Sequence, residues 1–191
     1  MRYTSLARRL AHLAMRPGDA WVDIAAEPGH PASVLLPWPA ILAALGPLSF
    51  LLGQALAGSA GVSLGRALGF ALVYYAAILG LLVLQATLLR RLGAILGCRP
   101  GDEEAFKLAV WSAVPFFISG LSLVAPRPHL ETVAVLAALL GGLADGHLLH
   151  QGLKILVQGD ARARGLLSAV AAGGLLTAWV LVFFLLLQIL L

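Results

Sequence analysis

Five long runs of apolar residues constrain the fold of this chain more than any other feature of its sequence. They cover residues 38–58, 64–89, 105–125, 132–157 and 166–191. A helix needs about 20 apolar residues to cross a hydrocarbon core about 30 Å thick. Because each run is continuous and does not alternate apolar with polar residues, it predicts a helix and not a barrel strand. We therefore expect an all-α membrane protein built as a bundle of five transmembrane helices.

The composition excludes several other classes of protein. Of the 191 residues, 60% are hydrophobic and 12% are charged, whereas soluble domains hold about 45–50% apolar and about 25% charged residues. A chain of this size has too much surface to hide so many apolar side chains from water. Cys98 is the one cysteine, so no disulfide can form within the chain. An ordinary cytosolic globule, a disordered chain and a disulfide-rich secreted module are all excluded.

The basic residues predict which side of the membrane each connection faces. Eleven of the 13 Lys and Arg residues precede the first run, lie between the second and third runs (with Lys107 just inside the third), or lie between the fourth and fifth. Arg66 and Arg127 fall on the other side. Since Lys and Arg are enriched in cytoplasmic loops, we expect a multi-pass protein of the bacterial cytoplasmic membrane, with the N-terminus in the cytoplasm and Leu191 outside.

The first 30 residues differ from the rest, and we expect a cytoplasmic amphipathic arm over 1–30 followed by a transmembrane domain over 31–191. Leu6, Leu10 and Leu13 share one face of a helix predicted over residues 3–15, and its opposite face carries Arg8, Arg9 and His12. A basic amphipathic helix of this kind lies in the membrane interface. Docking of a partner is a second interpretation, compatible with the first.

A second short helix is predicted after the first. Pro17 suits the first helical turn, and Trp21 suits the headgroup layer. Further along the chain, Pro47 and Pro115 are predicted to kink the first and third spans.

Polar residues inside the runs are candidate functional positions, because ionisable groups in hydrocarbon are expensive. Asp145 lies near the middle of the fourth run, and Lys107, Gln54 and Gln85 are the other polar candidates. Two interpretations of Asp145 stay open. It could form a hydrogen bond between helices, with Ser119, Tyr75 or Trp111 as partner, or it could belong to a proton or ion relay.

His147 and His150 are weak metal-ligand candidates. Three residues apart on one helical face, they could present two imidazoles to one ion, but Asp145 points to the other side of that helix. Hydrated histidines near the membrane surface are the plainer interpretation. We therefore expect no metal and no cofactor.

Catalytic motifs are missing from the sequence. It contains no G-x-x-x-x-G-K-[ST], no H-E-x-x-H and no C-x-x-C, and Ser119 lacks the leading glycine of G-x-S-x-G. Glu103 and Glu104 follow Asp102 at the predicted start of the third span, where acidic groups favour a helix dipole. We expect no catalytic residues and no enzyme activity.

Two stripes of small residues, each with a spacing of four, predict close helix packing in lipid. The fourth run carries Ala138, Gly142 and Gly146, and the fifth carries Gly165, Ala169 and Gly173. The pattern does not distinguish packing within one bundle from packing between protomers.

Three motifs resemble those of the bacterial branch of the Yip1 domain family. They are Arg16-Pro17…Trp21…Ile24…Glu27, then Ala105-Phe106-Lys107…Trp111-Ser112-Ala113-Val114-Pro115, and finally His147-Leu148-Leu149-His150-Gln151-Gly152-Leu153-Lys154. The resemblance covers nearly the whole chain and implies an integral membrane protein with five helices and a cytoplasmic N-terminus. Eukaryotic relatives are linked to vesicle traffic and prenylated small GTPases, but this sequence lacks their Tyr-Gly-Pro type signature, so GTPase binding is not carried over.

The function expected from this resemblance is non-enzymatic. It is a membrane scaffold or organising protein that acts through contacts with membrane lipids, with other membrane proteins or with copies of itself. The alternative is a small transporter or channel subunit with a polar path near Asp145. Nucleic acid is not an expected partner, because no segment remains to build a basic surface domain.

Overall fold

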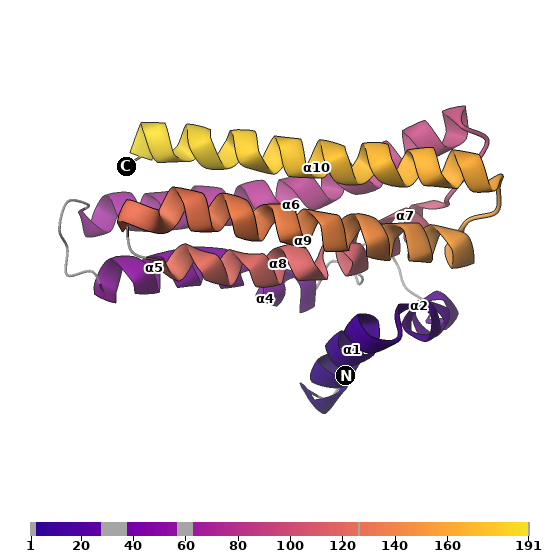
Figure 1. The fold of residues 1–191 in the computed structure, drawn as a ribbon, viewed down its shortest axis with the longest axis horizontal. Helices are drawn as coiled ribbons and strands as arrows, with labels where there is room; N and C mark the ends of the chain where they lie inside the picture. Colours follow the sequence, from indigo (N-terminus) through magenta and orange to yellow (C-terminus); the bar gives the residue numbers. More distant parts are fainter. Residues whose placement is uncertain (1–2, 28–37, 57–62, 126, 191) are drawn as a thin grey trace.

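The computed structural model describes residues 3–27, 38–56, 63–125 and 127–190. Five helical segments within them are long and apolar enough to cross a membrane. The segments run over Trp38–Leu56, Leu64–Ile95, Asp102–Val124, His129–Leu156 and Ala161–Leu186. They lie roughly parallel to one another, as Figure 1 shows. The all-α fold and the five predicted spans are therefore confirmed.

Two of the five segments are interrupted, and both interruptions lie just ahead of a proline. The first segment consists of α4 (Trp38–Ala43) and α5 (Leu45–Leu56), with Pro47 in the opening turn of α5. The third consists of α7 (Asp102–Ser112), α8 (Val114–Ser119) and the 3₁₀ helix η1 (Gly120–Val124). Proline removes a backbone donor and its ring collides with the carbonyl four residues earlier. The interruptions at Ala44 and Ala113 follow from this steric conflict, as predicted.

The other three spans are continuous helices of 30 or more residues. They are α6 (Leu64–Ile95), α9 (Arg127–Leu156) and α10 (Ala161–Leu190). Helix α10 packs on both α6 and α9, α5 packs on α6 and η1, and α8 packs on α9. Helix α7 packs on both α6 and α9. In Figure 1 the end of α6, the start of α7, the end of α9 and the start of α10 lie at one end of the bundle.

An aromatic cluster holds α6 to α10 in the half of the bundle away from that end. Trp179 of α10 donates its indole N–H to the Tyr74 hydroxyl of α6 at 2.6 Å. Phe183 stacks on Trp179, with ring centroids 5.1 Å apart, and Phe70 and Tyr74 of α6 lie against Phe183. Indole and phenol groups bury large apolar areas but need a polar partner when dry. In this pair the indole N–H donates and the phenol oxygen accepts, so each polar group has a partner.

The N-terminal arm contains two helices, α1 (Tyr3–Met15) and α2 (Pro17–Ala26). Pro17 occupies the first turn of α2, as predicted. Leu13 is 2% exposed, so the apolar side of α1 faces protein at this position; the side chain of Leu6 lies outside the described residues. Trp21 is fully buried, so its indole faces protein and not lipid headgroups, because α2 packs on α9.

Glycines bring α5 and η1 into direct backbone contact. A Cβ on Gly53 would lie 2.7 Å from the carbonyl oxygen of Val124, and a Cβ on Gly120 would lie 2.9 Å from the Gly46 Cα. Small residues allow such close approach in lipid, where helices gain nothing from excluding water. The irregular third span therefore packs directly on the first span, backbone against backbone.

A methyl group at position 53 should separate α5 from η1. The neighbour is backbone and cannot rotate away, so we expect Gly53→Ala to destabilise the protein by about 1–3 kcal/mol, measured by thermal unfolding in detergent. Gly80→Ala is the control, because nothing lies within 4 Å of a Cβ there. It should leave stability unchanged or raise it by up to about 1 kcal/mol. Equal unfolding temperatures for the two variants would contradict the close-contact account.

Candidate functional site

Three buried polar side chains meet inside the bundle from three different helices. Asp145 of α9 and Ser112 of α7 are 0% exposed, and Gln85 of α6 is 1% exposed. The side chains of Ser112 and Gln85 face the Asp145 carboxyl. Within the described residues, however, none of their polar atoms completes a hydrogen bond of good geometry. Buried polar atoms without well-formed hydrogen bonds are costly, so this polar cluster (Asp145, Ser112 and Gln85) is a candidate site.

The predicted partners of Asp145 are wrong, although its burial within the bundle is what either interpretation requires. Ser119 donates to the carbonyl of Phe116 in its own helix at 2.7 Å. Tyr75 donates to the carbonyl of Ala40 in α4 at 3.1 Å, and the ring of Trp111 lies under a guanidinium of the arm. These groups sit at other depths or on other faces, which a single helical wheel cannot show. Ser112 was not among the predicted polar candidates, since a serine in an apolar helix can satisfy its hydroxyl within that helix.

Lys107 does not join the polar cluster; it binds the N-terminal arm. Its side chain is buried and its ammonium group donates to the carbonyls of Ala25 and Glu27, where α2 ends. It also pairs with Glu103 one turn earlier, at 2.7 Å. A cation at a helix C-terminus satisfies carbonyls that lack helical partners and favours the helix dipole. Gln54, the remaining polar candidate, is half-buried on α5.

The indole of Trp21 locks α2 onto the bundle. A Cβ on Gly152 of α9 would lie 2.7 Å both from the Trp21 ring and from Cδ2 of Leu108. Only a glycine leaves room for the ring here. Trp21 and Gly152 belong to two different motifs of the sequence, and the structure brings the two motifs into contact.

Charged groups of the arm add two further contacts. The Arg9 guanidinium forms a two-fold ion pair with Glu27, which joins α1 to the end of α2. The same guanidinium lies over the Trp111 ring of α7, 5.5 Å from its centroid, a favourable cation–π geometry. The arm is therefore fixed to the bundle by aromatic packing, by Lys107 and by Arg9, which a wheel of the arm alone could not predict.

The histidine pair lies outside the bundle core. His147 is exposed and His150 is half-buried, both on the outward side of α9. In the part of the chain that the structure describes, no group of three His, Cys, Asp or Glu residues is placed to hold a metal ion.

The two small-residue stripes have different surroundings. On α9, Ala138 is buried, Gly142 packs on Leu176 and Gly146 packs on Ala172, so this stripe faces α10. Ser168 of α10 also donates to the Gly146 carbonyl at 3.1 Å. On α10, nothing lies within 4 Å of a Cβ on Gly165 or Gly173, and Ala169 is exposed. The second stripe is therefore on the outer surface, and packing between protomers stays a prediction.

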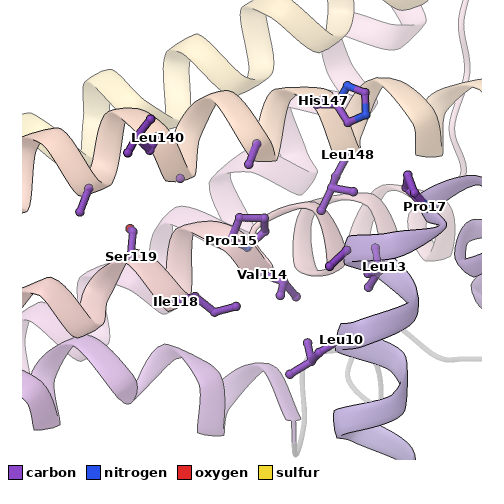
Figure 2. Close-up of a pocket in the computed structure, with 14 residues that line it drawn as sticks. Leu10, Leu13, Pro17, Val114, Pro115, Ile118, Ser119, Leu140, His147 and Leu148 are labelled. Carbon is purple, nitrogen blue, oxygen red and sulfur yellow. The ribbon is translucent and has the colours of Figure 1, made fainter.

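An apolar groove of about 680 Å³ lies between the arm and the bundle. Helix α1 forms one wall, with Leu10 and Leu13, and α8 and α9 form the other walls (Figure 2). Sequence patterns could not reveal it, because the arm is about 100 residues away in the chain from the two helices that it meets here.

Comparison with known proteins identifies the family. The family model described as the Yip1 domain matches residues 11–189, so the chain belongs to the Yip1 domain family. The resemblance inferred from the three motifs is confirmed. No curated protein and no solved structure matches the chain.

Filling the space beside Trp21 should release the arm. In Gly152→Ala the new methyl group would collide with the indole and with Leu108, and we expect arm opening to increase about tenfold, equivalent to about 1.4 kcal/mol. Limited proteolysis at the arginines of α1 in detergent measures the open fraction. Gly165→Ala is the control, since that position has open space around it. Unchanged proteolysis in Gly152→Ala would show that Trp21 does not hold the arm.

Proposed function

We propose that this Yip1-domain protein is a non-enzymatic scaffold of the bacterial cytoplasmic membrane, acting through contacts with lipids and with other membrane proteins. The observation that carries the proposal is the fixed arm. Aromatic packing, a cation–π contact and a buried lysine hold α1 and α2 against α7 and α9. A surface held so firmly presents a constant set of side chains to a neighbour, which reduces the entropic cost of binding.

The orientation in this proposal places the arm in the cytoplasm and the C-terminus outside. The basic distribution of the sequence supports it. The arm lies near the bundle end where α6 and α9 finish and where α7 and α10 begin, opposite the C-terminus in Figure 1. Arg90, Arg91, Arg99, Arg162 and Arg164 lie in or beside the connections at this end.

One labelling experiment tests both orientation and contacts. Ala11 is exposed on α1, so Ala11→Cys should react with a membrane-impermeant maleimide only from the cytoplasmic side of membrane vesicles. Ser63→Cys, at the other end of the bundle, should react only from outside, and Cys98 of the parent chain is buried and should not react. Labelling of Ala11→Cys from outside alone would contradict the orientation.

A photoactivatable group on the same maleimide then reports what the arm touches. The scaffold proposal predicts cross-links from Ala11→Cys to a reproducible set of membrane proteins, absent from Ser63→Cys and reduced when Gly152→Ala releases the arm. Cross-links to lipid alone, or the same proteins from both cysteines, would contradict the scaffold role.

A small transporter or channel subunit is the second candidate, because Asp145, Ser112 and Gln85 are buried together and, within the described residues, complete no hydrogen bond of good geometry. Such groups inside a membrane bundle are typical of proton and ion pathways. In the scaffold proposal the cluster is structural, so vesicles containing the wild-type protein should show no proton or cation flux above empty vesicles. Flux in the wild type that disappears in Asp145→Asn, with an unchanged unfolding temperature, would establish the transporter function instead.

A further inference from the structure

The apolar groove beneath the arm has the walls that a hydrocarbon chain requires. Val114, Pro115 and Ile118 of α8 form one side, and Leu140 and Leu148 lie along α9 on the other (Figure 2). Leu10 and Leu13 of α1 close the end next to the arm. Its volume of about 680 Å³ falls within the range of pockets that hold small organic ligands, about 300–1,000 Å³.

The length of the groove matches one leaflet of a bilayer. On α9 its lining extends from Ala137 to Leu148, which is about 16 Å at 1.5 Å per residue. Half of a hydrocarbon core about 30 Å thick is about 15 Å. The groove begins beside the arm at Leu148 and extends along α9 past the middle of the helix to Ala137. Its length is therefore close to that of one acyl chain in a leaflet.

Basic groups border the arm end of the groove. His147 lines the groove and is exposed, and His150 and Lys154 follow it on the outward face of α9 toward the end of the helix. The charges that act on His150 are those of Lys154, His147 and Arg164, and all three are basic. Asp160, in the following turn, accepts a hydrogen bond from the backbone of Arg162. An anionic group at this edge would meet complementary charge.

We propose that the groove binds one acyl chain of an anionic phospholipid of the cytoplasmic leaflet, with the lipid phosphate beside His147 and Lys154. The chain lies between α8 and α9 and passes under Leu10 and Leu13 of the arm. The inference deepens the proposed function and rests on it, because it names the lipid that the scaffold holds. Bound there, the lipid fills the space between arm and bundle, so arm and lipid stabilise each other.

The experiment uses the full chain in vesicles of phosphatidylcholine that contain a phosphatidylglycerol probe with a diazirine in its acyl chain. After illumination, peptides carrying the probe are identified by mass spectrometry. Labelling should concentrate on residues 114–119 and 137–148. A phosphatidylcholine probe with the same acyl chain should label these peptides several-fold less. Even labelling of all lipid-facing helices would overturn the proposal.

Two variants that fill the groove provide the decisive comparison. Ala144→Trp acts from α9 and Ile118→Trp acts from α8, and both positions line the groove. Either should reduce labelling of the groove peptides several-fold, while Ala169→Trp, on the exposed face of α10, should not. Unchanged labelling in a groove variant that keeps its unfolding temperature would overturn the proposal. Using two walls keeps the test valid if one variant fails to fold.

The charge component is tested separately. His147→Gln combined with Lys154→Gln should remove the preference for phosphatidylglycerol over phosphatidylcholine and keep the labelled positions. Retention of the full preference would refute the phosphate assignment. Cross-links between two copies of the chain at the groove, in place of lipid, would assign it to a second protomer. Loss of groove labelling together with intact protein cross-links from Ala11→Cys would refute this inference alone and leave the scaffold proposal standing.

Discussion

Hydrocarbon offers no hydrogen bonds, and most of this structure follows from that constraint. Inside a membrane each backbone group must be satisfied within the protein, so the chain is helical wherever it spans. Where prolines interrupt the helix, neighbouring helices pack against one side of the irregular segments. Helix η1 lies against α5 at backbone distance, beside Gly46 and Gly53. The polar tips of Trp179 and Tyr74 meet each other. The polar cluster of Asp145, Ser112 and Gln85 differs, because within the described residues its polar atoms complete no hydrogen bond of good geometry; the same holds for the Trp21 indole N–H. Three such side chains in one place make the cluster a candidate site.

The sequence alone predicted the spans because long apolar runs report directly on hydrocarbon thickness. It predicted the two interruptions because proline acts on its own helix. It could not predict contacts between distant segments. The wheel of α9 correctly separated Asp145 from His147, but it held no information about which helix each would face. Ser112 and Gln85 reach Asp145 through the packing of α6, α7 and α9, and Trp21 reaches Gly152 across 131 residues of chain.

Burial of Lys107 shows how tertiary contacts change the meaning of a polar residue. In the sequence alone, a lysine near the start of a span indicates either a transport pathway or a side chain that extends to water at the membrane surface. Here its ammonium group satisfies the last carbonyls of α2 and pairs with Glu103. A buried charge is tolerated when it is paired and hydrogen-bonded. The lysine therefore helps to hold the arm on the bundle. The carbonyl groups at the end of α2 accept the hydrogen bonds that lipid could not accept.

Each side of helix α9 contacts a different part of the protein, and this accounts for its mixed polarity. One side places Asp145 against α6 and α7, a second packs Gly142 and Gly146 on α10, and a third lines the groove and receives Trp21. The fourth carries His150 and Lys154 outward, and His147 lies at its border with the groove. A surface helix with one task shows one apolar stripe; a helix with neighbours on several sides does not. The span that looked least regular in sequence is therefore the one on which arm, core and groove all depend.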